Sequence, residues 1–278
     1  MKRTCSLVNV RVIALTLVPC LIVVGQSSPT PVLQKFAGVW MEDESKLKIG
    51  DAFGKLRFRQ NGDGLEELRG PEVKPLVQSV KFGTKPYAID GSTNTIAWKQ
   101  IDSSHFERSI FNEGKLQNTR RIELSADGKA LTEVTEVARP GEKKYQTTIA
   151  FQRISGGPQG LVGIWKAQSV KRVPAPTVRY ELSGTDGLKV SEDFGGNARQ
   201  YSVKMDNVPV AVVGKTIVSG TMTAFRVVDD HTLESTSSRQ GVVAGKDTLV
   251  VSGDGKVITS TATTTGNREP TIRVFNKQ

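Results

Sequence analysis

The chain has 278 residues, of which 37% are hydrophobic and 24% charged, and its formal net charge is +10. This balance excludes a multispan membrane protein and a disordered acidic chain. The two histidines and two cysteines are too few for a zinc finger, an iron–sulfur site or a disulfide scaffold.

The first 25 residues have the layout of a secretory signal peptide. Lys2 and Arg3 lie in a basic stretch, residues 12–25 form an uncharged apolar run, and polar residues follow from Gln26 onward. The run is shorter than the ~20 residues that cross a bilayer. We therefore expect cleavage near Gln26 and export to the periplasm or the exterior of a bacterial cell, with no membrane span after processing.

Both cysteines, Cys5 and Cys20, lie in this segment, so the mature chain would contain none. Pro19 stands where a lipoprotein signal needs a small residue, so a lipid anchor at Cys20 is not expected. Basic residues are mixed with acidic ones, and no basic stripe alternates with aromatic residues. We therefore expect no nucleic-acid partner.

The rest of the chain is a tandem repeat whose copies are offset by about 125 residues. The matching segments keep the same order, and they are Gly38-x-Trp40 with Gly163-x-Trp165, residues 97–102 with 224–229, residues 127–129 with 254–256, and Phe151-x-Arg153 with Phe275-x-Lys277. A short Gly-rich stretch at residues 155–160 separates the copies. We therefore expect two domains, at 31–155 and 159–278.

Each copy is predicted to be β throughout. Short runs rich in β-branched and aromatic residues alternate in polarity, as half-buried strands do. The clearest runs are residues 77–82, 105–111, 178–182 and 201–205, and residues 130–137 form a further run that alternates imperfectly. Asp-Gly pairs between such runs close hairpins, because Asp-Gly tolerates positive φ. About eight strands per copy, with the first joined to the last, favour two tandem up-and-down antiparallel barrels over sandwiches.

The copies resemble lipocalin-like domains of the calycin group, in the short form found in secreted bacterial proteins. The resemblance rests on residues 32–40, which match the opening motif with its Gly-x-Trp, and on the basic residue of the last strand. The central Thr-Asp-Tyr-type motif of that family is missing. An avidin-type barrel also begins with Gly-x-Trp and is the alternative.

In lipocalins the tryptophan crosses the barrel floor beneath the basic residue of the last strand. Carried over, this implies that Arg153 covers Trp40. It also implies that Lys277 covers Trp165, or that Arg273 does so in a different register. These residues, with Gly38 and Gly163, are the structural positions that the resemblance singles out.

The candidates for catalysis are better explained by turns. His105 follows Asp102 and Ser104, and His231 follows Asp229, so each set lies within one predicted hairpin turn. Members of a catalytic triad usually come from separate elements, so that their side chains converge. These patterns therefore predict turns rather than an active site.

Two other patterns are interpreted as structural. The acidic residues 42–44 lack the spacing and glycine of a calcium loop, and are expected to form a solvated loop. Trp98 and Phe225 occupy matching repeat positions and are expected in the barrel cores rather than as ligand platforms. We therefore expect no metal and no cofactor.

The resemblance implies an exported, non-enzymatic protein that binds a small, largely apolar molecule or a lipid. The alternative is a structural or interaction module of the cell envelope, with barrels filled by side chains. No acid–base or nucleophilic constellation predicts an enzyme. A chamber of ~300 Å³ or more would favour the binding protein over the filled module.

Overall fold

A computed structural model describes residues 30–50, 54–69, 76–83, 85–89, 93–137, 143–157, 159–214, 217–266 and 269–278. The predicted signal peptide, residues 1–25, lies outside these ranges. The described chain consists mainly of strands, preceded by the short helix α1 (Pro31–Phe36) and interrupted by the 3-10 helix η1 (Glu44–Lys46). The all-β prediction is therefore confirmed.

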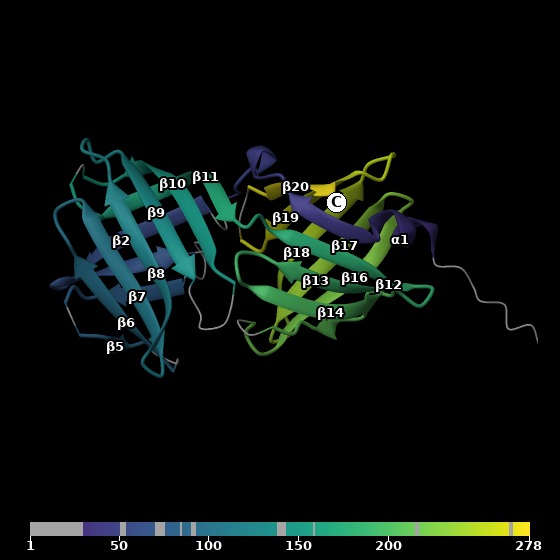
Figure 1. The fold of residues 1–278 in the computed structure, drawn as a ribbon, viewed down its shortest axis with the longest axis horizontal. Coiled ribbons are helices and arrows are strands. Elements are labelled where there is room, and N and C mark those ends of the chain that lie inside the picture. Colours follow the sequence, from purple (N-terminus) through teal and green to yellow (C-terminus); the bar gives the residue numbers. More distant parts are fainter. Residues whose placement is uncertain are drawn as a thin grey trace, which may run out of the picture.

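The described strands form two antiparallel sheets of ten strands each (Figure 1). Each sheet curls around its own hydrophobic core, and we call the two curled sheets the first barrel and the second barrel. The first barrel contains β2 (Lys55–Asn61), β3 (Gly64–Arg69), β4 (Leu76–Val80), β5 (Tyr87–Ala88), β6 (Asn94–Gln100), β7 (His105–Asn112), β8 (Lys115–Leu124), β9 (Ala130–Val137), β10 (Tyr145–Ser155) and β11 (Gly163–Val173). The second barrel contains β1 (Gly38–Glu42), β12 (Thr177–Ser183), β13 (Gly187–Asp193), β14 (Ala198–Lys204), β15 (Val210–Ala211), β16 (Thr221–Asp229), β17 (Thr232–Arg239), β18 (Val242–Val251), β19 (Val257–Thr264) and β20 (Thr271–Lys277).

The opening strands of the two sequence copies are exchanged between the barrels. Strand β1, from the first copy, pairs with β12 and β20 of the second barrel. Strand β11, from the second copy, pairs with β2 and β10 of the first barrel. In Figure 1 the purple β1 accordingly lies beside the green and yellow strands. The first barrel is thus one continuous segment, whereas the second combines the start of the described chain with its C-terminal part.

This exchange means that the repeat boundaries and the barrel boundaries do not coincide. The copies 31–155 and 159–278 each contribute one strand to the barrel built mainly by the other copy. The physical reason is the sequence match between the opening strands. Both β1 and β11 begin with Gly-x-Trp, so either strand can fill the slot between a second strand and a last strand.

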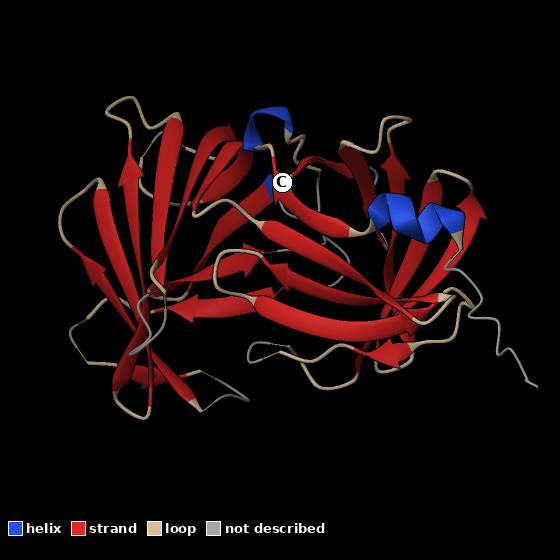
Figure 2. Cartoon of the chain, turned by 45° about the vertical axis from the view of Figure 1, so that its right-hand side comes forward, coloured by secondary structure: helices blue, strands red, loops and turns tan. Residues whose placement is uncertain are grey.

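The second barrel is nearly closed, and it is capped at the end where Trp40 lies. Gln200 and Val213 exchange backbone hydrogen bonds of 2.8 and 2.9 Å, which join the two edges of the sheet. Helix α1 packs across this end of the barrel (Figure 2), and its Val32, Leu33 and Phe36 are buried in the core. Pro31 suits the first helical turn, because its fixed φ matches the helix and its missing N–H needs no partner there.

The cores are formed by alternating residues of the strands, as the polarity pattern predicts. Trp98 is fully buried in the first core and Phe225 is 2% exposed in the second. Strand β9 has the bounds that the sequence predicts, residues 130–137. Each copy has ten described strands rather than the expected eight, and one strand of each copy, β5 or β15, has two residues and is too short for a polarity pattern to predict.

Charged side chains join the two barrels where the exchanged connections cross. Arg172, near the end of β11, lies 3.2 Å from Glu44 Oε1 and 3.4 Å from Glu42 Oε2. Tyr145 of β10 donates a hydrogen bond of 2.7 Å to Asp193 of β13. The barrels therefore share polar contacts as well as strands.

Candidate functional site

A buried ion network fills the interior of the first barrel. Arg120 is 1% exposed, donates to Glu67 Oε1 at 2.7 Å through Nη1, and contacts the other carboxylate oxygen through Nη2. Arg69 pairs with both Glu67 and Glu133. The Arg120 guanidinium also lies 4.9 Å from the ring centre of Trp98. Two carboxylates and two guanidiniums therefore occupy the space that a ligand would need.

The electrostatics of this network keep its carboxylates charged. Burial alone would raise the pKa of Glu67, but attraction to Arg120 and Arg69 outweighs burial and holds that pKa well below its ordinary value. Burial would likewise raise the pKa of Glu133, but attraction to Arg69 and Arg120 outweighs burial and lowers that pKa. The carboxylates of the first interior are thus compensated by Arg69 and Arg120, while burial and the neighbouring Arg120 lower the pKa of Arg108 beside them to about 9.

The second barrel carries different, mostly smaller residues at the matching interior positions. Arg108 is opposite Arg120 across β7 and β8, just as Ser235 is opposite Asp247 across β17 and β18, so the strand registers equate these pairs. The matched interior residues, first barrel before second, are Trp98 and Phe225, Arg108 and Ser235, Asn118 and Gly245, Arg120 and Asp247, and Glu133 and Ser260. At these matched positions the second interior lacks the long charged side chains of the first, while Glu192, Arg199 and Arg273 enter it from other strands.

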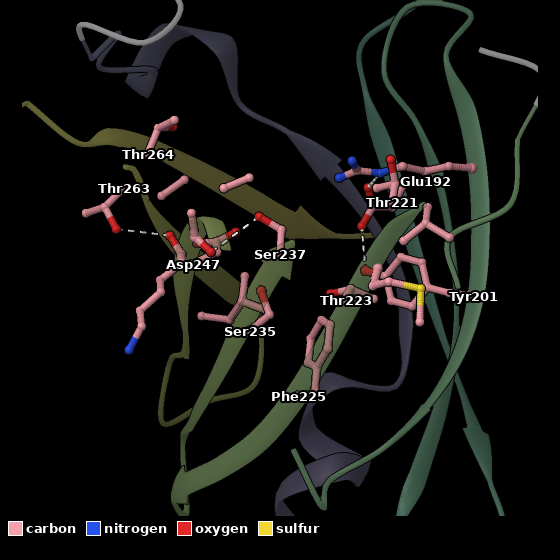
Figure 3. Close-up of a pocket in the computed structure, with 18 of the residues that line it drawn as sticks. Glu192, Tyr201, Thr221, Thr223, Phe225, Ser235, Ser237, Asp247, Thr263 and Thr264 are labelled. Atoms are coloured by element: carbon pink, nitrogen blue, oxygen red, sulfur yellow. Dashed lines mark hydrogen bonds and ion pairs between the residues drawn. The ribbon is translucent and has the colours of Figure 1, made fainter. Parts of the chain in front are cut away.

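These replacements leave a pocket of about 330 Å³ inside the second barrel (Figure 3). Its lining is partly aromatic, with Tyr180, Tyr201 and Phe225, and partly hydroxyl-bearing. The hydroxyl-bearing residues are Thr221, Thr223, Ser235, Ser237, Thr263 and Thr264. Figure 3 shows Glu192 and Tyr201 on one side of the pocket and Asp247 on the other.

The two carboxylates of this pocket differ in their partners. Glu192 accepts hydrogen bonds from Arg199 Nε and, at 2.7 Å, from the hydroxyl of Tyr201. Asp247 accepts hydrogen bonds of 2.9 Å from Ser260 Oγ at both carboxylate oxygens. Burial raises the pKa of Asp247 to about 6, because the hydrogen bonds and the more distant Arg273 only partly offset the loss of water.

The two Gly-x-Trp tryptophans lie fully buried at equivalent places in the two barrels. The indole N–H of Trp40 donates to the carbonyl oxygen of Phe36 at 2.7 Å. That of Trp165 donates to Leu161 at 2.9 Å. In both barrels the tryptophan is therefore tied to the carbonyl four residues before it.

The predicted pairing of these tryptophans with their basic covers is wrong. Lys277 Nζ, not Arg153, lies over Trp40, 5.0 Å from the ring centre. Arg153 lies over Trp165, 4.0 Å from the ring centre. The strand exchange is the cause, because it places each tryptophan beside the last strand of the other copy. Arg273, the alternative cover, instead lines the pocket and lies 5.1 Å over the ring of Phe194.

Gly38 and Gly163 are needed for this close packing. Their φ angles are 136° and 145°, a region that residues with a side chain rarely adopt. A Cβ on Gly38 would lie 2.8 Å from Lys277 Cε, and one on Gly163 would lie 2.5 Å from the carbonyl oxygen of Ser155. The glycines therefore let the basic cover and the neighbouring strand approach the tryptophan.

The ends of the two barrels at these tryptophans differ. Helix α1 covers the end of the second barrel at Trp40. In the first barrel no helix stands directly before Trp165 in the described chain, and Leu161 is the residue buried there. A hollow of about 710 Å³ lies at this end of the first barrel, lined by turn and strand-end residues such as Ser104, Phe106 and Gly160. It lies among turns, outside the ion network that fills the barrel interior.

The remaining sequence candidates have local structural roles. Asp102 Oδ1 accepts the backbone N–H groups of Ser104 and His105 at 2.8 Å, which is the hydrogen bonding of a tight turn. His231 lies 3.0 Å from Lys35 Nζ, away from the pocket lining. The expectation of a solvated loop at residues 42–44 is wrong for Glu42, which is 4% exposed at the end of β1.

No group of three His, Cys, Asp or Glu side chains gathers as a metal site would require in the described part of the chain. The helices within the described ranges are likewise too short or too polar to cross a membrane. Searches among known protein families, curated proteins and solved structures find no match to this chain.

Among the residues of the pocket, only Phe225 and Arg273 stand out in the sequence, and the sequence predicts neither of them to line a ligand site. Asp247, Ser235, Glu192 and Tyr201 belong to no recognisable motif. The signal that could have found them is the repeat itself. Position by position, the strands of one copy carry long charged residues where those of the other carry serine, glycine and aspartate, and such a contrast on inward-facing positions predicts a filled barrel and a hollow one.

Proposed function

We propose that this chain is an exported, non-enzymatic binding protein whose ligand occupies the second barrel. The observation that carries the proposal is the pocket of about 330 Å³ at interior positions where the first barrel has a closed ion network. Ligand pockets are concave, largely preformed, and combine apolar walls with a few convergent polar groups. The aromatic side chains, the hydroxyl groups and Asp247 supply this combination.

The two barrels would then have different tasks. The first barrel, filled by Glu67, Arg120 and their partners, would act as a structural unit, which agrees with the alternative of a filled module for this half alone. The second would bind the ligand. Tyr201 and Phe225 offer apolar surface, while Thr223 and Ser235 offer hydrogen bonds, so the ligand would have an apolar body and at least one polar group.

The test is native mass spectrometry of the mature protein, purified from its own host under mild conditions. We expect a bound small molecule that is released on denaturation. The variant Ser235→Phe would fill the pocket and abolish this adduct. The matched control is Thr236→Phe on the same strand, whose side chain points to the opposite face of the sheet.

A folded wild-type protein with no adduct, and with no change in thermal stability on addition of a chemically diverse small-molecule library, would contradict the proposal. An adduct that survives in Ser235→Phe but not in Thr236→Phe would place binding outside the barrel and contradict it as well. Circular dichroism of both variants would confirm that each has folded.

A further inference from the structure

We propose that the ligand of the second barrel is a small organic cation, an amine or amidine with an apolar body, whose cationic group binds Asp247. This inference rests on the proposed function, because it assigns a chemical class to the ligand of that same pocket. It is carried by two observations: the partners of Asp247 and the internal comparison of the two barrels.

The first barrel shows how this scaffold accommodates a cation in its interior. There the guanidinium of Arg120 lies 4.9 Å over the ring of Trp98 and pairs with Glu67. In the second barrel the position of Trp98 is kept aromatic as Phe225, while the position of Arg120 carries Asp247. The aromatic position is thus kept, and the position that carries a guanidinium in the first barrel carries a carboxylate in the second. A ligand cation would restore the arrangement.

The room for such a group comes from the neighbouring strand positions. Ser235 replaces Arg108 opposite Asp247, and Gly245 replaces Asn118 one inward position along β18. Both residues line the pocket. Aromatic faces attract organic cations, most strongly where water is excluded, so Phe225 would contact the apolar body next to the cationic group.

Asp247 differs from Glu192 in the pocket lining and from the nearby Glu42, because each of those two carboxylates has an arginine within 4.0 Å. Glu192 is paired with Arg199, and Glu42 lies 3.8 Å from Arg273 Nε. Among the described residues, Asp247 has the hydroxyl of Ser260 as its hydrogen-bond donor and no ion pair within 4.0 Å. A buried carboxylate that is hydrogen-bonded but not ion-paired is stabilised in its charged form by an added cation.

The charged and titratable groups that face Asp247 come from four strands. They are Tyr180 on β12, Glu192 on β13, Arg199 on β14 and Arg273 on β20. The two arginines are each paired with a carboxylate of their own, so they offset the burial of Asp247 only in part. Since burial raises the pKa of Asp247 to about 6, the carboxylate is charged at pH 7.5 and mostly protonated at pH 5. Cation binding should therefore weaken on acidification.

The experiment uses three probes of nearly the same shape on the intact mature protein. They are 2-phenylethylamine, the neutral 2-phenylethanol and the anionic 3-phenylpropionate, and binding is measured by isothermal titration calorimetry at pH 7.5 and pH 5. We expect the amine to bind at least ten times more tightly than either other probe at pH 7.5. We expect this preference to fall at least five-fold at pH 5, where the amine itself is still fully charged.

The variant Asp247→Asn keeps the shape of the side chain and removes its charge. It should bind 2-phenylethylamine and 2-phenylethanol equally, with affinities that do not change between pH 5 and 7.5. The control Asp229→Asn changes an exposed residue at the end of β16 and should leave the amine preference intact.

Equal or tighter binding of the alcohol or the carboxylate by the wild-type protein would overturn the cation assignment and leave the proposed function standing. Failure of all three probes at millimolar concentration would overturn the cation assignment too, while the adduct in native mass spectrometry decides the proposed function separately. Because the comparison of probes needs only the wild-type protein, it is decisive even if Asp247→Asn does not fold.

Discussion

The guanidinium of Arg153 lies 4.0 Å from the ring centre of Trp165, although the two residues belong to different copies of the repeat. It also donates hydrogen bonds of 2.6 Å to the carbonyl oxygens of Gly128, Gly160 and Val162. One side chain therefore ties β10, the turn before β9 and the segment that leads into β11. This relationship fixes the strand exchange, since Trp165 can lie under Arg153 only if β11 belongs to the first barrel.

The first prediction concerns the part of the chain that folds alone. Residues 54–173 contain β2 to β11 and all the strands of the first barrel, so this fragment should unfold in one cooperative thermal transition. Residues 31–155 contain one complete sequence copy but lack β11, which pairs with β10 along most of its length. This second fragment should be less stable by several kcal/mol, or molten.

Both fragments would be expressed and compared by circular dichroism and by urea unfolding. The expected order of stability reverses if the strands pair within each copy rather than across copies. A cooperative 31–155 fragment that is more stable than 54–173 would therefore show that the exchange is wrong.

The second prediction is a double-mutant cycle on Trp165 and Arg153 in the 54–173 fragment. Trp165→Ala removes a fully buried indole and should cost about 3–5 kcal/mol of the free energy of unfolding. Arg153→Ala removes its carbonyl hydrogen bonds and its contact with the ring, and should cost about 1–3 kcal/mol. The two losses should fall short of additivity by about 0.5–2 kcal/mol, because both variants remove one cation–π contact.

The matched control is the cycle between Trp40 and Arg153 in the full chain. Since Trp40 lies under Lys277, these two losses should add within about 0.5 kcal/mol. Coupling between Trp40 and Arg153, with none between Trp165 and Arg153, would mean that the barrels keep their own opening strands.

Much of the fold follows from local sequence rules. The polarity alternation predicts most strands, and the Asp-Gly pairs predict the turns, because both depend on neighbours along the chain. The Gly-x-Trp motif and the basic residue of the last strand correctly identify the tryptophans and the cations that lie over them, although not which cation covers which tryptophan. The sequence does not say which copy supplies each strand, because β1 and β11 are alike at Gly-x-Trp and the choice depends on the connections that follow them.

The pocket is harder to predict, because inward and outward residues become meaningful only once the strand registers are known. Arg120 and Glu67 are far apart in the sequence, and nothing local indicates that they pair inside a barrel. Likewise, Glu42 is buried because β1 lies between β12 and β20, a consequence of the exchange. Charged residues on an alternating strand are ordinarily expected on the solvent face, and here several face inward.

The third prediction concerns the ion network of the first barrel. Arg120→Leu removes one partner of a buried pair and leaves Glu67 without its bidentate contact, so it should cost about 3–5 kcal/mol. Adding Glu67→Leu should recover part of this loss, since an apolar pair needs no compensation. The exposed pair of Arg59 and Glu66 is the control, and Arg59→Leu should cost at most about 1 kcal/mol.

Urea unfolding of these variants in the 54–173 fragment measures each cost. If Arg120→Leu were as mild as Arg59→Leu, the network would not be desolvated in solution. In that case the contrast between a filled first barrel and a hollow second barrel would lose its basis.

The last prediction concerns the pH dependence of stability that Asp247 causes. In the folded protein burial raises the pKa of Asp247 to about 6, whereas in the unfolded chain it lies near its ordinary value of about 3.9. The folded state therefore binds more protons than the unfolded state between pH 4 and pH 6, so stability must fall as the pH rises through this window. The full effect corresponds to about 3 kcal/mol, reduced by the partial exposure of the side chain. Asp247→Asn should be about as stable as the wild-type protein near pH 4. At pH 7 the variant should be the more stable of the two.

Urea unfolding of the full chain at pH 4, 5, 6 and 7, followed by a near-ultraviolet signal of the second barrel, measures both curves. Glu67 and Glu133, whose pKa values are lowered, oppose this trend equally in both proteins, so the difference between the curves isolates Asp247. Parallel curves across this range would show that Asp247 is solvated, and that the pocket does not hold a carboxylate in need of a cation.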